Sequence, residues 1–488
     1  MLTLPGIASP RVTSFPVIAA AVCGIAAFNL CFHLHVDTIQ QWDESLYATT
    51  AWEMLRSGDW IGTTFQGTLD YYNTKPPLNF WLIALSFKLF GVSLIALRLP
   101  SVVAAFATVA LLVAWGRRHL GESTALFFGL VLGTMYPFFY VHAGRSANTD
   151  AINTCLVVVT VMILWGARAR PWRLVWLGPV LAAVFLLRGL AVLLPAAIVA
   201  IDEVRTFGAR RRGRWAPTAV AAAIFLVPVT AWMIARWHVD EWAFLSRVFL
   251  YDGFARSVVA IENHPGSVFY YLKILLRYAY DWPTGAMVAV ALFPLSLDRV
   301  RTAFRSGRDA AGPGPLLLVW AMVAFLIPTA MQTKLPWYLH SFYPVFAIAL
   351  GGLFAHSCRQ ATTAPGGWRS WRARTLVAVI VLAACVAQGR LIWYSYHHLD
   401  LSTSSQGLMI AERDALAGRA IYSNRFDRAD LFVAHAMAGA THRLAVDVAE
   451  FMRDSRPGDF LLSAKPLHDP AIVLVWAGGG HYLYRRTE

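Results

Sequence analysis

The sequence predicts an all-α polytopic membrane protein with a small α/β domain at its carboxyl end, outside the bilayer. Of the 488 residues, 57% are hydrophobic and 14% are charged, whereas a soluble chain carries about 25% charged residues. Apolar runs recur up to about residue 395, and arginines gather in the short loops between them. Beyond that point, short alternating segments are typical of a soluble domain.

Eleven apolar runs of about 16–21 residues are long enough to cross about 30 Å of hydrocarbon. They lie near 15–34, 98–116, 123–141, 149–167, 172–187, 189–204, 216–236, 280–298, 314–331, 336–356 and 374–394. The segment Met1–Pro10 lacks the basic region and cleavage site of a signal peptide. We therefore expect the first run to remain as a membrane anchor.

Every second connection between these spans is rich in arginine. The arginine-rich connections are Arg117-Arg118, Arg168–Arg173, Arg205–Arg214, Arg299–Arg308 and Arg359–Arg374. The positive-inside rule places them in the cytoplasm, with the N-terminus inside and the C-terminus outside. Topology thus accounts for the net charge of +14, and we expect no binding of nucleic acid.

Two further segments are not counted as spans. If Pro77–Gly91 crossed the membrane, every later arginine loop would move outside, so we expect it to lie at the outer surface or to be tucked into the protein. Ser45–Ser57 is interpreted in the same way. Either of the short runs that flank Arg188-Gly189 could form half of a hairpin.

Residues 1–397 are therefore expected to form the membrane domain and residues 398–488 a soluble α/β domain. In the latter we predict four strands, at Arg419–Asn424, His442–Val448, Asp459–Ser463 and Ala471–Trp476, separated by helical stretches such as Arg428–Met437. It contains no catalytic motif, so we expect it at most to cap the site. The five cysteines show no CxxC spacing and are interpreted as small hydrophobic residues.

The first outer loop, 35–97, contains the main candidates for chemistry. Asp43 and Glu44 follow the first span, where two adjacent carboxylates do nothing for membrane insertion. A carboxylate in partly apolar surroundings can act as a general base. Capping of the helix that follows is the structural alternative for Asp43.

Lysine is rare in this chain, and all five lysines fall on the predicted outer side. An ammonium group there works against the charge rule, and phosphate binding would explain it. Lys75, beside Pro76-Pro77, is the strongest candidate for a phosphate contact. Lys334 and Tyr338 repeat the combination of lysine, proline and aromatic residue at another outer loop. Contact with lipid headgroups or a salt bridge is the alternative.

Three more outer positions are candidates. Asp150 begins a span, where an unpaired carboxylate would be costly. Arg145 is its expected partner, and Asp150 could instead be a second acid that orients the acceptor or the base. His264 is a candidate metal or phosphate ligand, and Arg277 is a candidate phosphate contact within an aromatic stretch.

Several of these motifs together resemble the ArnT-like glycosyltransferases, which are relatives of the protein mannosyltransferases with the GT-C fold. The motifs are Asp43-Glu44-Ser45-Leu46-Tyr47, Glu53–Trp60, Lys75-Pro76-Pro77-Leu78-Asn79-Phe80-Trp81 and Arg98-Leu99-Pro100-Ser101. The resemblance implies that a sugar is transferred with inversion from a polyprenyl-phosphate carrier outside the bacterial cytoplasmic membrane. It further implies that Asp43 is the catalytic acid, Lys75 the carrier-phosphate contact and Asp150 the second acidic position.

The acceptor implied is an envelope glycolipid similar to lipid A, a polysaccharide or a protein. No cofactor is certain. A divalent metal is left open. Members that transfer aminoarabinose carry an acidic residue, part of a metal site, where this chain has Thr74, and this departure argues against a bound metal and against aminoarabinose as the sugar. The alternative function is a transporter or flippase of a lipid-linked sugar, but the matching halves usual in transporters are not evident between 1–200 and 200–400.

Overall fold

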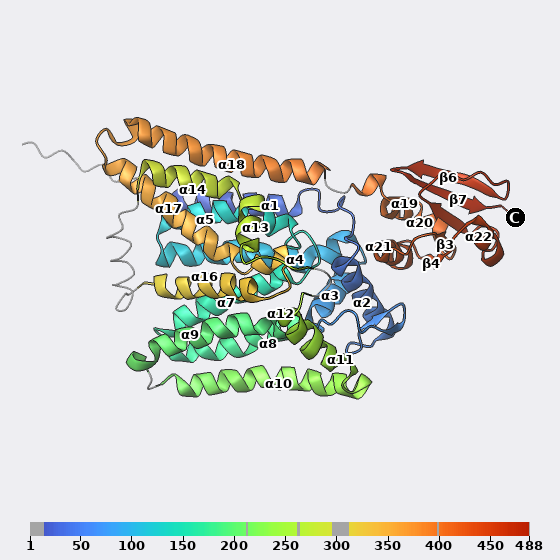
Figure 1. Cartoon of the computed structure of the whole chain (residues 1–488), viewed down its shortest axis with the longest axis horizontal. Helices are drawn as coiled ribbons and strands as arrows, with labels where there is room; N and C mark the ends of the chain where they lie inside the picture. The colour runs from blue at the N-terminus through green and yellow to red at the C-terminus, as the bar shows by residue number, and fades with distance from the viewer. Residues whose placement is uncertain (1–13, 211–212, 261–263, 295–311, 398–399, 488) are drawn as a thin grey trace, which may run out of the picture.

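The computed structural model describes residues 14–210, 213–260, 264–294, 312–397 and 400–487. A bundle of apolar helices forms most of the molecule (Figure 1). Its members are α1 (Ser14–Cys31), α4 (Leu94–His119), α5 (Glu122–Gly133), α7 (Asp150–Ala167), α8 (Leu177–Arg188), α9 (Leu193–Arg210), α10 (Trp215–Asp240), α14 (Asp281–Leu292), α16 (Gly314–Ala330), α17 (Tyr343–Thr363) and α18 (Trp371–His397). Each predicted span contains one of these helices, which confirms the polytopic membrane architecture.

Contacts between charged residues show how α7, α8 and α9 are threaded. Arg188 at the end of α8 contacts Asp150 at the start of α7. Arg168, just after α7, pairs with Asp202 of α9 at 2.9 Å. The chain therefore reverses between α8 and α9, at Gly189, whose φ of 56° suits glycine. The predicted hairpin at this point is confirmed.

The arginine-rich connections within the described residues lie at the end of the bundle away from the C-terminal domain (Figure 1). They join α4 to α5, α7 to α8 and α17 to α18. One predicted connection, Arg299–Arg308, lies outside the described residues. Shorter elements between the helices are α6 (Tyr136–Tyr140), η1 (Pro171–Trp176), η2 (Gly189–Val192), α11 (Ala243–Ser246), η3 (Arg247–Ala255), α12 (Arg256–Val258), α13 (Tyr270–Tyr278), η6 (Pro336–Leu339) and η7 (Gly367–Arg369).

Two of the predicted spans have different limits. The run 123–141 is divided into α5 and α6, and Pro137 lies in the first turn of α6. The run 336–356 becomes helical only at Tyr343, because Pro336 begins a separate 3₁₀ turn and Pro344 begins α17. Residues 335–342 are thereby left outside the long helices, where their side chains can line a cavity.

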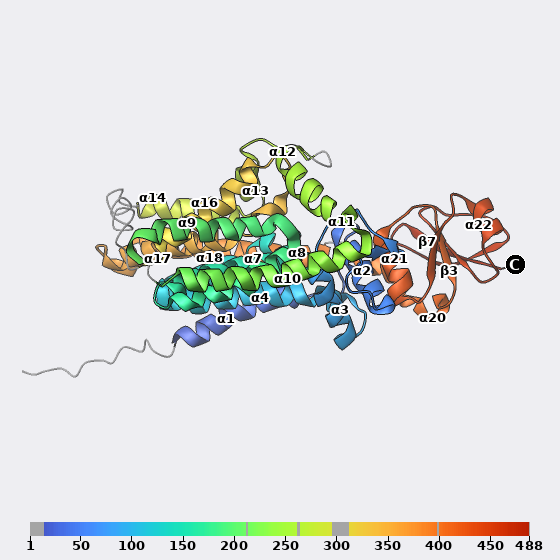
Figure 2. The same ribbon diagram turned by 90° about the horizontal axis from the view of Figure 1, so that it is seen from below.

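The juxtamembrane helices α2 (Asp43–Ser57) and α3 (Leu78–Phe90) lie between the bundle and the C-terminal domain (Figures 1 and 2). A two-stranded hairpin of β1 (Thr64–Phe65) and β2 (Thr68–Leu69) connects them. Both helices match segments that we predicted not to cross the membrane, and their placement agrees with that prediction. The ring of Phe87 stacks on Phe432 of the C-terminal domain, with centroids 6.1 Å apart.

The C-terminal domain is built around one five-stranded sheet. Its elements are η8 (Leu401–Thr403), α19 (Ser405–Ala411), α20 (Arg413–Leu416), β3 (Ala420–Ser423), α21 (Arg428–Phe432), η9 (Val433–Met437), β4 (Thr441–Leu444), α22 (Val448–Asp454), β5 (Phe460–Ser463), β6 (Ile472–Gly478) and β7 (His481–Arg486). The strand order is β4-β3-β5-β7-β6. The β3 strand is parallel to both neighbours, whereas β7 is antiparallel to β5 and β6. All four predicted strands are present, and β7 was not predicted.

This domain is fixed to the first outer loop. Gln406 accepts a hydrogen bond from the backbone N–H of Ile39 at 2.8 Å and donates one to its carbonyl at 3.1 Å. Leu408 and Phe432 are buried in the same hydrophobic cluster as residues of α2 and α3. The C-terminal domain therefore packs against one end of the molecule, where α2 and α3 lie.

Candidate active site

A cavity of about 820 Å³ opens at the end of the bundle that faces the C-terminal domain. Its lining comes from α2, from the loops before α3 and α7, from η2 and η3, and from the segment between α16 and α17. Titratable residues that line it include Asp43, Lys75, His142, Asp150, Arg188, Asp252, Arg256 and His340. These residues come from segments far apart in the sequence, and folding of the chain brings them together at one cavity.

Four of these residues form a continuous row of hydrogen bonds and ion pairs, which we call the acidic row. Nε2 of His142 lies 3.2 Å from Oδ2 of Asp43, and Nδ1 lies 2.9 Å from Oδ2 of Asp150. The other oxygen of Asp150 accepts a hydrogen bond from Arg188. Asp43 is 39% exposed and Asp150 is 2% exposed. The row therefore runs from Arg188, which is 15% exposed, to the more accessible carboxylate of Asp43.

His142 holds this row together. Its ring stacks on Trp337, with centroids 4.2 Å apart and planes 10° apart. Its φ of 58° lies in the left-handed region, which is uncommon for residues other than glycine and recurs at functional sites. Burial opposes the imidazolium, but hydrogen bonds with Asp150 and Asp43 outweigh burial and raise the pKa of His142 to about 9.

Protonated His142 in turn affects Asp43. Burial disfavours the ionised carboxylate, but the hydrogen bond and the charge of His142, with the charge of Lys75, outweigh burial and lower the pKa of Asp43. Both Asp43 and His142 are therefore charged at neutral pH. With Asp150 ionised and Arg188 protonated, the acidic row carries two negative and two positive charges, so its net charge is zero.

A second set of charges, the basic row, lines the same cavity. Nζ of Lys75 lies 2.7 Å from Oδ2 of Asp252, and Nε of Arg256 lies 2.8 Å from Oδ1 of the same carboxylate. Two cations and one anion give this row a net charge of +1. Lys75 and Asp252 are 17% and 16% exposed, so both remain accessible from the cavity. An excess positive charge suits a phosphate diester.

Comparisons with known proteins find several similar chains. Residues 74–232 match the family model described as dolichyl-phosphate-mannose-protein mannosyltransferase. A relative from Edwardsiella ictaluri, named undecaprenyl phosphate-alpha-4-amino-4-deoxy-L-arabinose arabinosyl transferase, is 30% identical over 320 residues. A Pseudomonas aeruginosa protein of the same name is 29% identical over 342 residues. These matches cover 64% and 67% of this chain, and 54% and 58% of the relatives. The chain thus spans little more than half the length of these curated relatives.

Solved structures show the same fold over almost the whole chain. The crystal structure of ArnT from Cupriavidus metallidurans bound to undecaprenyl phosphate matches with a TM-score of 0.67 at 18% identity, over 97% of this chain and 98% of that one. The chain is similar to ArnT in fold over almost its whole length. The Archaeoglobus fulgidus oligosaccharyltransferase matches more distantly, with a TM-score of 0.58 and 12% identity over 88% of this chain and 64% of that one. This chain therefore has the same fold as these membrane proteins.

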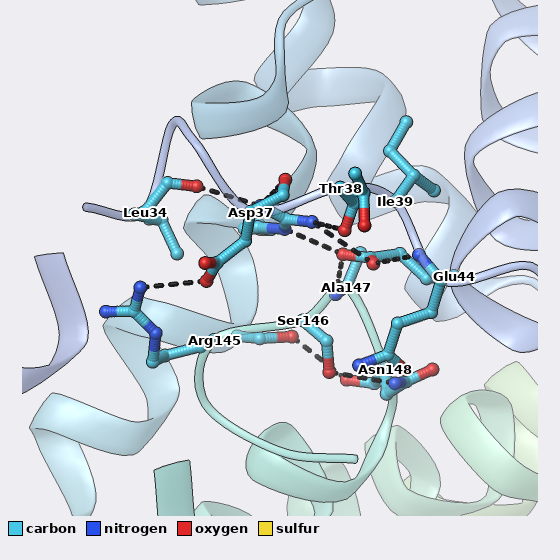
Figure 3. Close-up of polar contacts among 12 residues, drawn as sticks. Leu34, Asp37, Thr38, Ile39, Glu44, Arg145, Ser146, Ala147 and Asn148 are labelled. Carbon is cyan, nitrogen blue, oxygen red and sulfur yellow. Dashed lines mark hydrogen bonds and ion pairs between the residues drawn. The ribbon is translucent and has the colours of Figure 1, made fainter. Parts of the chain in front are cut away.

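Glu44 does not reach the cavity, contrary to the catalytic role predicted for it. It is fully buried, and its carboxylate accepts hydrogen bonds from Nε of Arg98 at 2.8 Å and from the backbone N–H of Ala147 at 3.0 Å. Arg98 also donates to carbonyls of the loop after α1, namely those of Leu34, Asp37 and Thr38. Figure 3 shows Glu44 among these loop residues. The pair organises the loop that precedes Asp43.

The predicted partnership of Arg145 with Asp150 is wrong. The guanidinium of Arg145 lies 2.8 Å from Asp37 (Figure 3) and donates to carbonyls at the end of α1, including that of Phe32. Arg188 and His142 pair with Asp150 instead. The geometry therefore gives Arg145 a part in holding two loops together, and the cavity lining does not include it.

The remaining predicted contacts differ in their access to the cavity. Tyr338 and His264 line it, and the ring centroid of Tyr338 lies 5.7 Å from the guanidinium of Arg188. Lys334 is buried, and its ammonium donates to carbonyls at the end of α16, including that of Pro328 at 3.4 Å. Arg277 lies against Tyr278 on an exposed face of α13 and is not part of the lining.

The capping interpretation of Asp43 also fails, since the N-cap of α2 is Trp42 and no side chain caps it. Sequence reasoning missed His142, Arg188, Asp252, Arg256 and Trp337 as site residues. Arg188 could have been recognised, because it is a single charged residue between two apolar runs. We interpreted it only as the boundary between two spans. The other four lie in a loop (His142) or in short helical elements between the long helices (Asp252, Arg256 and Trp337), and nothing in the sequence marks which of these residues meet.

The donor atoms around the cavity do not fit a metal site. Thr74, at the position before Lys75, supplies no carboxylate. Within the described part of the chain, no group of three His, Cys, Asp or Glu side chains is placed to hold a metal ion. Both ring nitrogens of His142 are already occupied by carboxylates. We therefore derive no step through a metal.

Proposed function

We propose that this protein transfers a sugar, with inversion, from a polyprenyl-phosphate carrier to an acceptor in the cell envelope. The observation that carries the proposal is that the acidic row and the basic row face one cavity. The relatives are named as transferases that use an undecaprenyl-phosphate sugar, and the matched ArnT structure holds undecaprenyl phosphate. Both facts support the same donor class here.

In the proposed reaction Asp43 is the base. An acceptor hydroxyl or amine approaches the anomeric carbon from the face opposite the phosphate and gives its proton to Asp43 as the new bond forms. The bond between the anomeric carbon and the phosphate oxygen breaks, and its electron pair leaves with the carrier phosphate. His142 and Asp150 hold Asp43 in position, so that the two reactants meet in one geometry.

Lys75 and Arg256 stabilise the leaving group in this proposal. The donor is a diester with one negative charge, which the net charge of the basic row balances. Bond breaking adds a second negative charge on the phosphate, and nearby cations are most valuable where such charge develops. Asp252 fixes the positions of the two cations relative to each other, because its carboxylate forms an ion pair with each of them.

Apolar side chains at one side of the cavity suit the polyprenyl chain. They come from η2 and α9 and from the end of α16, and are Leu190, Ala191, Leu193, Leu194, Ile327, Pro328 and Met331. A hydrocarbon chain there would remain next to the membrane while its phosphate reached the basic row. The cavity lining is thus divided between a lipid part and a polar part.

We further propose that the cavity faces the outside of the bacterial cytoplasmic membrane. The arginine-rich connections lie at the opposite end of the bundle, and the positive-inside rule assigns that end to the cytoplasm. Donor, acceptor and the C-terminal domain would then all lie on the outer side. The acceptor is an envelope glycolipid, a polysaccharide or a protein.

A transporter of lipid-linked sugars is the second candidate, but the position of the charges disfavours it. Transporters bind their substrate near the middle of the membrane, between matching halves. Here the two charged rows lie at one end of the bundle. Purified full-length protein, incubated in lipid nanodiscs with labelled undecaprenyl-phosphate sugars and an envelope extract, separates the two functions. A transferase releases undecaprenyl phosphate and labels an acceptor, whereas donor that stays intact in every reaction would refute the proposal.

A further inference from the structure

Arg236, near the end of α10, is a buried cation that the proposed chemistry does not use. Its side chain is fully buried, and the lining of the cavity does not include it. The guanidinium forms an ion pair with Asp240, one turn further along the same helix, and its Nε lies 3.2 Å from Oδ1 of that carboxylate. One carboxylate balances the charge of one guanidinium, so the further contacts of Arg236 are not needed for charge balance.

The edge of the guanidinium binds the first outer loop. Nη1 donates a hydrogen bond to the carbonyl of Ile61 at 3.2 Å and another to Oγ1 of Thr63 at 3.3 Å. The carbonyl of Thr63 accepts a hydrogen bond from the backbone N–H of Asp70 at 2.9 Å. The carboxylate of Asp70 in turn accepts one from the backbone N–H of Asn73 at 3.3 Å. These bonds connect Arg236 to the backbone two residues before Lys75.

The flat face of the same guanidinium packs on a different segment. Its central carbon lies 4.0 Å from the ring centroid of Phe244, which is fully buried. Phe244 lies in the first turn of a continuous helical segment, residues 243–258, formed by α11, η3 and α12. Asp252 lies further along that segment. Arg236 therefore contacts both the loop that carries Lys75 and the helical segment that carries its partner.

These three parts of the chain meet at the end of α10 nearest the C-terminal domain (Figures 1 and 2). Tyr71, four residues before Lys75, has its hydroxyl beside Asp240, and its ring packs against the hydrophobic cluster that contains Phe244. Lys75 and Asp252 are 177 residues apart in the sequence, so only contacts between distant segments can fix their separation.

We propose that Arg236 is a positioning residue that sets the place of Lys75 relative to Asp252, and thereby the place of the carrier phosphate. Arg236 touches neither the phosphate nor Lys75, and it acts through the two segments that it joins. A planar group with N–H donors on its edge and an apolar face suits this role, because it can bind polar backbone and an aromatic ring together. The inference rests on the proposed function, which assigns Lys75 to the phosphate.

A purely structural ion pair is the competing explanation. Arg236 and Asp240 could serve only to stabilise the end of α10. In that case the effects of losing Arg236 and of losing Lys75 on ligand binding would be independent, and they would add. If Arg236 acts through Lys75, its effect on binding should vanish once Lys75 has been removed. A double-mutant cycle separates the two explanations.

The experiment measures the Kd of undecaprenyl phosphate for the full-length protein in phosphatidylcholine nanodiscs. Arg236→Lys keeps a positive charge beside Asp240, so no buried carboxylate loses its partner, but an ammonium lacks the planar fork that binds the loop. We expect binding about tenfold weaker, which is less than the roughly 10²-fold that a misplacement of about 1 Å can cost in catalysis. In a Lys75→Met background the same change should alter the Kd by less than about twofold. Additive effects of the two changes would overturn the proposal.

Arg214→Lys is the matched control, at the opposite end of α10. Arg214 is also buried, its Nε lies 3.0 Å from a carboxylate oxygen of Glu203, and it donates to the carbonyl of Ala167 at 3.2 Å. The Kd should stay unchanged in this variant. Thr63→Val is a second test variant that keeps the ion pair of Arg236 and removes one acceptor of the loop. It should weaken binding by about threefold, the effect of one neutral hydrogen bond, and again only while Lys75 is present.

A readout without ligand distinguishes failure of this inference from failure of the proposed function. Undecaprenyl phosphate that does not bind the unaltered protein would refute the proposed function. The rate of reductive methylation of Lys75, followed by mass spectrometry, still reports on its ion pair with Asp252. It should rise by about threefold in Arg236→Lys, as expected for the loss of a partly exposed ion pair, and stay unchanged in Arg214→Lys. Equal rates in all three proteins would overturn the role of Arg236.

Discussion

His142 is hydrogen-bonded to Asp43, with Nε2 of the imidazole 3.2 Å from Oδ2 of the carboxylate. The opposite nitrogen of the ring pairs with Asp150, so one imidazolium separates two carboxylates that would otherwise repel each other. Stacking on Trp337 fixes the plane of the ring. The position of the proposed base therefore depends on a residue that does not itself react.

Replacing Asp43 by asparagine should abolish transfer. An amide keeps the size of the side chain but cannot accept a proton from the acceptor, and general-base catalysis contributes about 10²–10⁴-fold to a rate. We expect turnover to fall by at least about 10²-fold, with expression and membrane insertion close to normal. The measurement is release of undecaprenyl phosphate from a labelled donor.

The control for this variant is Asp414→Asn, because the side chain of Asp414 is fully exposed on the C-terminal domain. It should retain full activity. Unchanged turnover in Asp43→Asn would remove Asp43 from the mechanism, while the assignment of the cavity to the donor would remain.

His142 should make the stability of the protein depend on pH. Its pKa is raised to about 9 in the folded protein from an ordinary value of about 6.5. The resulting stabilisation is complete below about pH 6.5 and is lost as the pH rises through about 9. The apparent Tm should therefore decrease over this interval, and it should decrease less in His142→Gln, which cannot titrate. Parallel Tm curves for the two proteins would show that His142 gains no such stabilisation.

The fold of the membrane part could be predicted because it depends on local signals. Span length and the arginine loops each reflect a requirement of the bilayer, and they were enough to place all eleven helices. Strand β7 escaped prediction because His481–Arg486 begins and ends with polar residues and shows no clear apolar alternation. Its place between β5 and β6 is stabilised by pairing, which no local pattern reveals.

The candidate site could be predicted only in part. Asp43 and Lys75 stand in motifs of the first outer loop, and their charges had no role in insertion. Asp252 and Arg188 are separated from Lys75 by more than a hundred residues, and only the threading of the bundle brings them to the same cavity. Glu44 is next to Asp43 and stood out in the sequence for the same reason, a carboxylate with no role in membrane insertion. Adjacent residues of a helix face different directions, however, and the side chain of Glu44 points to Arg98 instead of the cavity.

Lys75→Met should weaken binding of undecaprenyl phosphate by about 10- to 100-fold, because a hydrogen bond to a charged group contributes about 1.5–3 kcal/mol. Folding should be preserved, since Asp252 retains its ion pair with Arg256. Equilibrium binding to protein in nanodiscs measures the effect. Lys465→Met, a change at an exposed lysine of the C-terminal domain, should bind as tightly as the unaltered protein, and equal binding by Lys75→Met would contradict the phosphate assignment.

Chelation should not stop the reaction. Thr74 offers no carboxylate beside Lys75, and His142 has no ring nitrogen left for a metal. We expect turnover after treatment with EDTA and passage through a desalting column to stay within about twofold of the untreated rate, less than the effect of one lost hydrogen bond. A loss that added Mg²⁺, Mn²⁺ or Zn²⁺ restores would show that a metal takes part.

Glu44→Gln should destabilise the protein without acting on the chemistry. The side chain of Arg98 is only 1% exposed, and Glu44 is its ion-pair partner. Leaving a buried charge without its partner costs about 3–5 kcal/mol of folding free energy. The apparent Tm and the yield of folded protein should both fall, whereas turnover per folded molecule should stay near normal. Glu122→Gln is the matched control, because its ion pair with Arg117 is about half exposed and surface pairs contribute at most about 1 kcal/mol. A Glu44→Gln protein that keeps its Tm but loses turnover would return Glu44 to the catalytic residues, since a purely structural carboxylate cannot produce that combination.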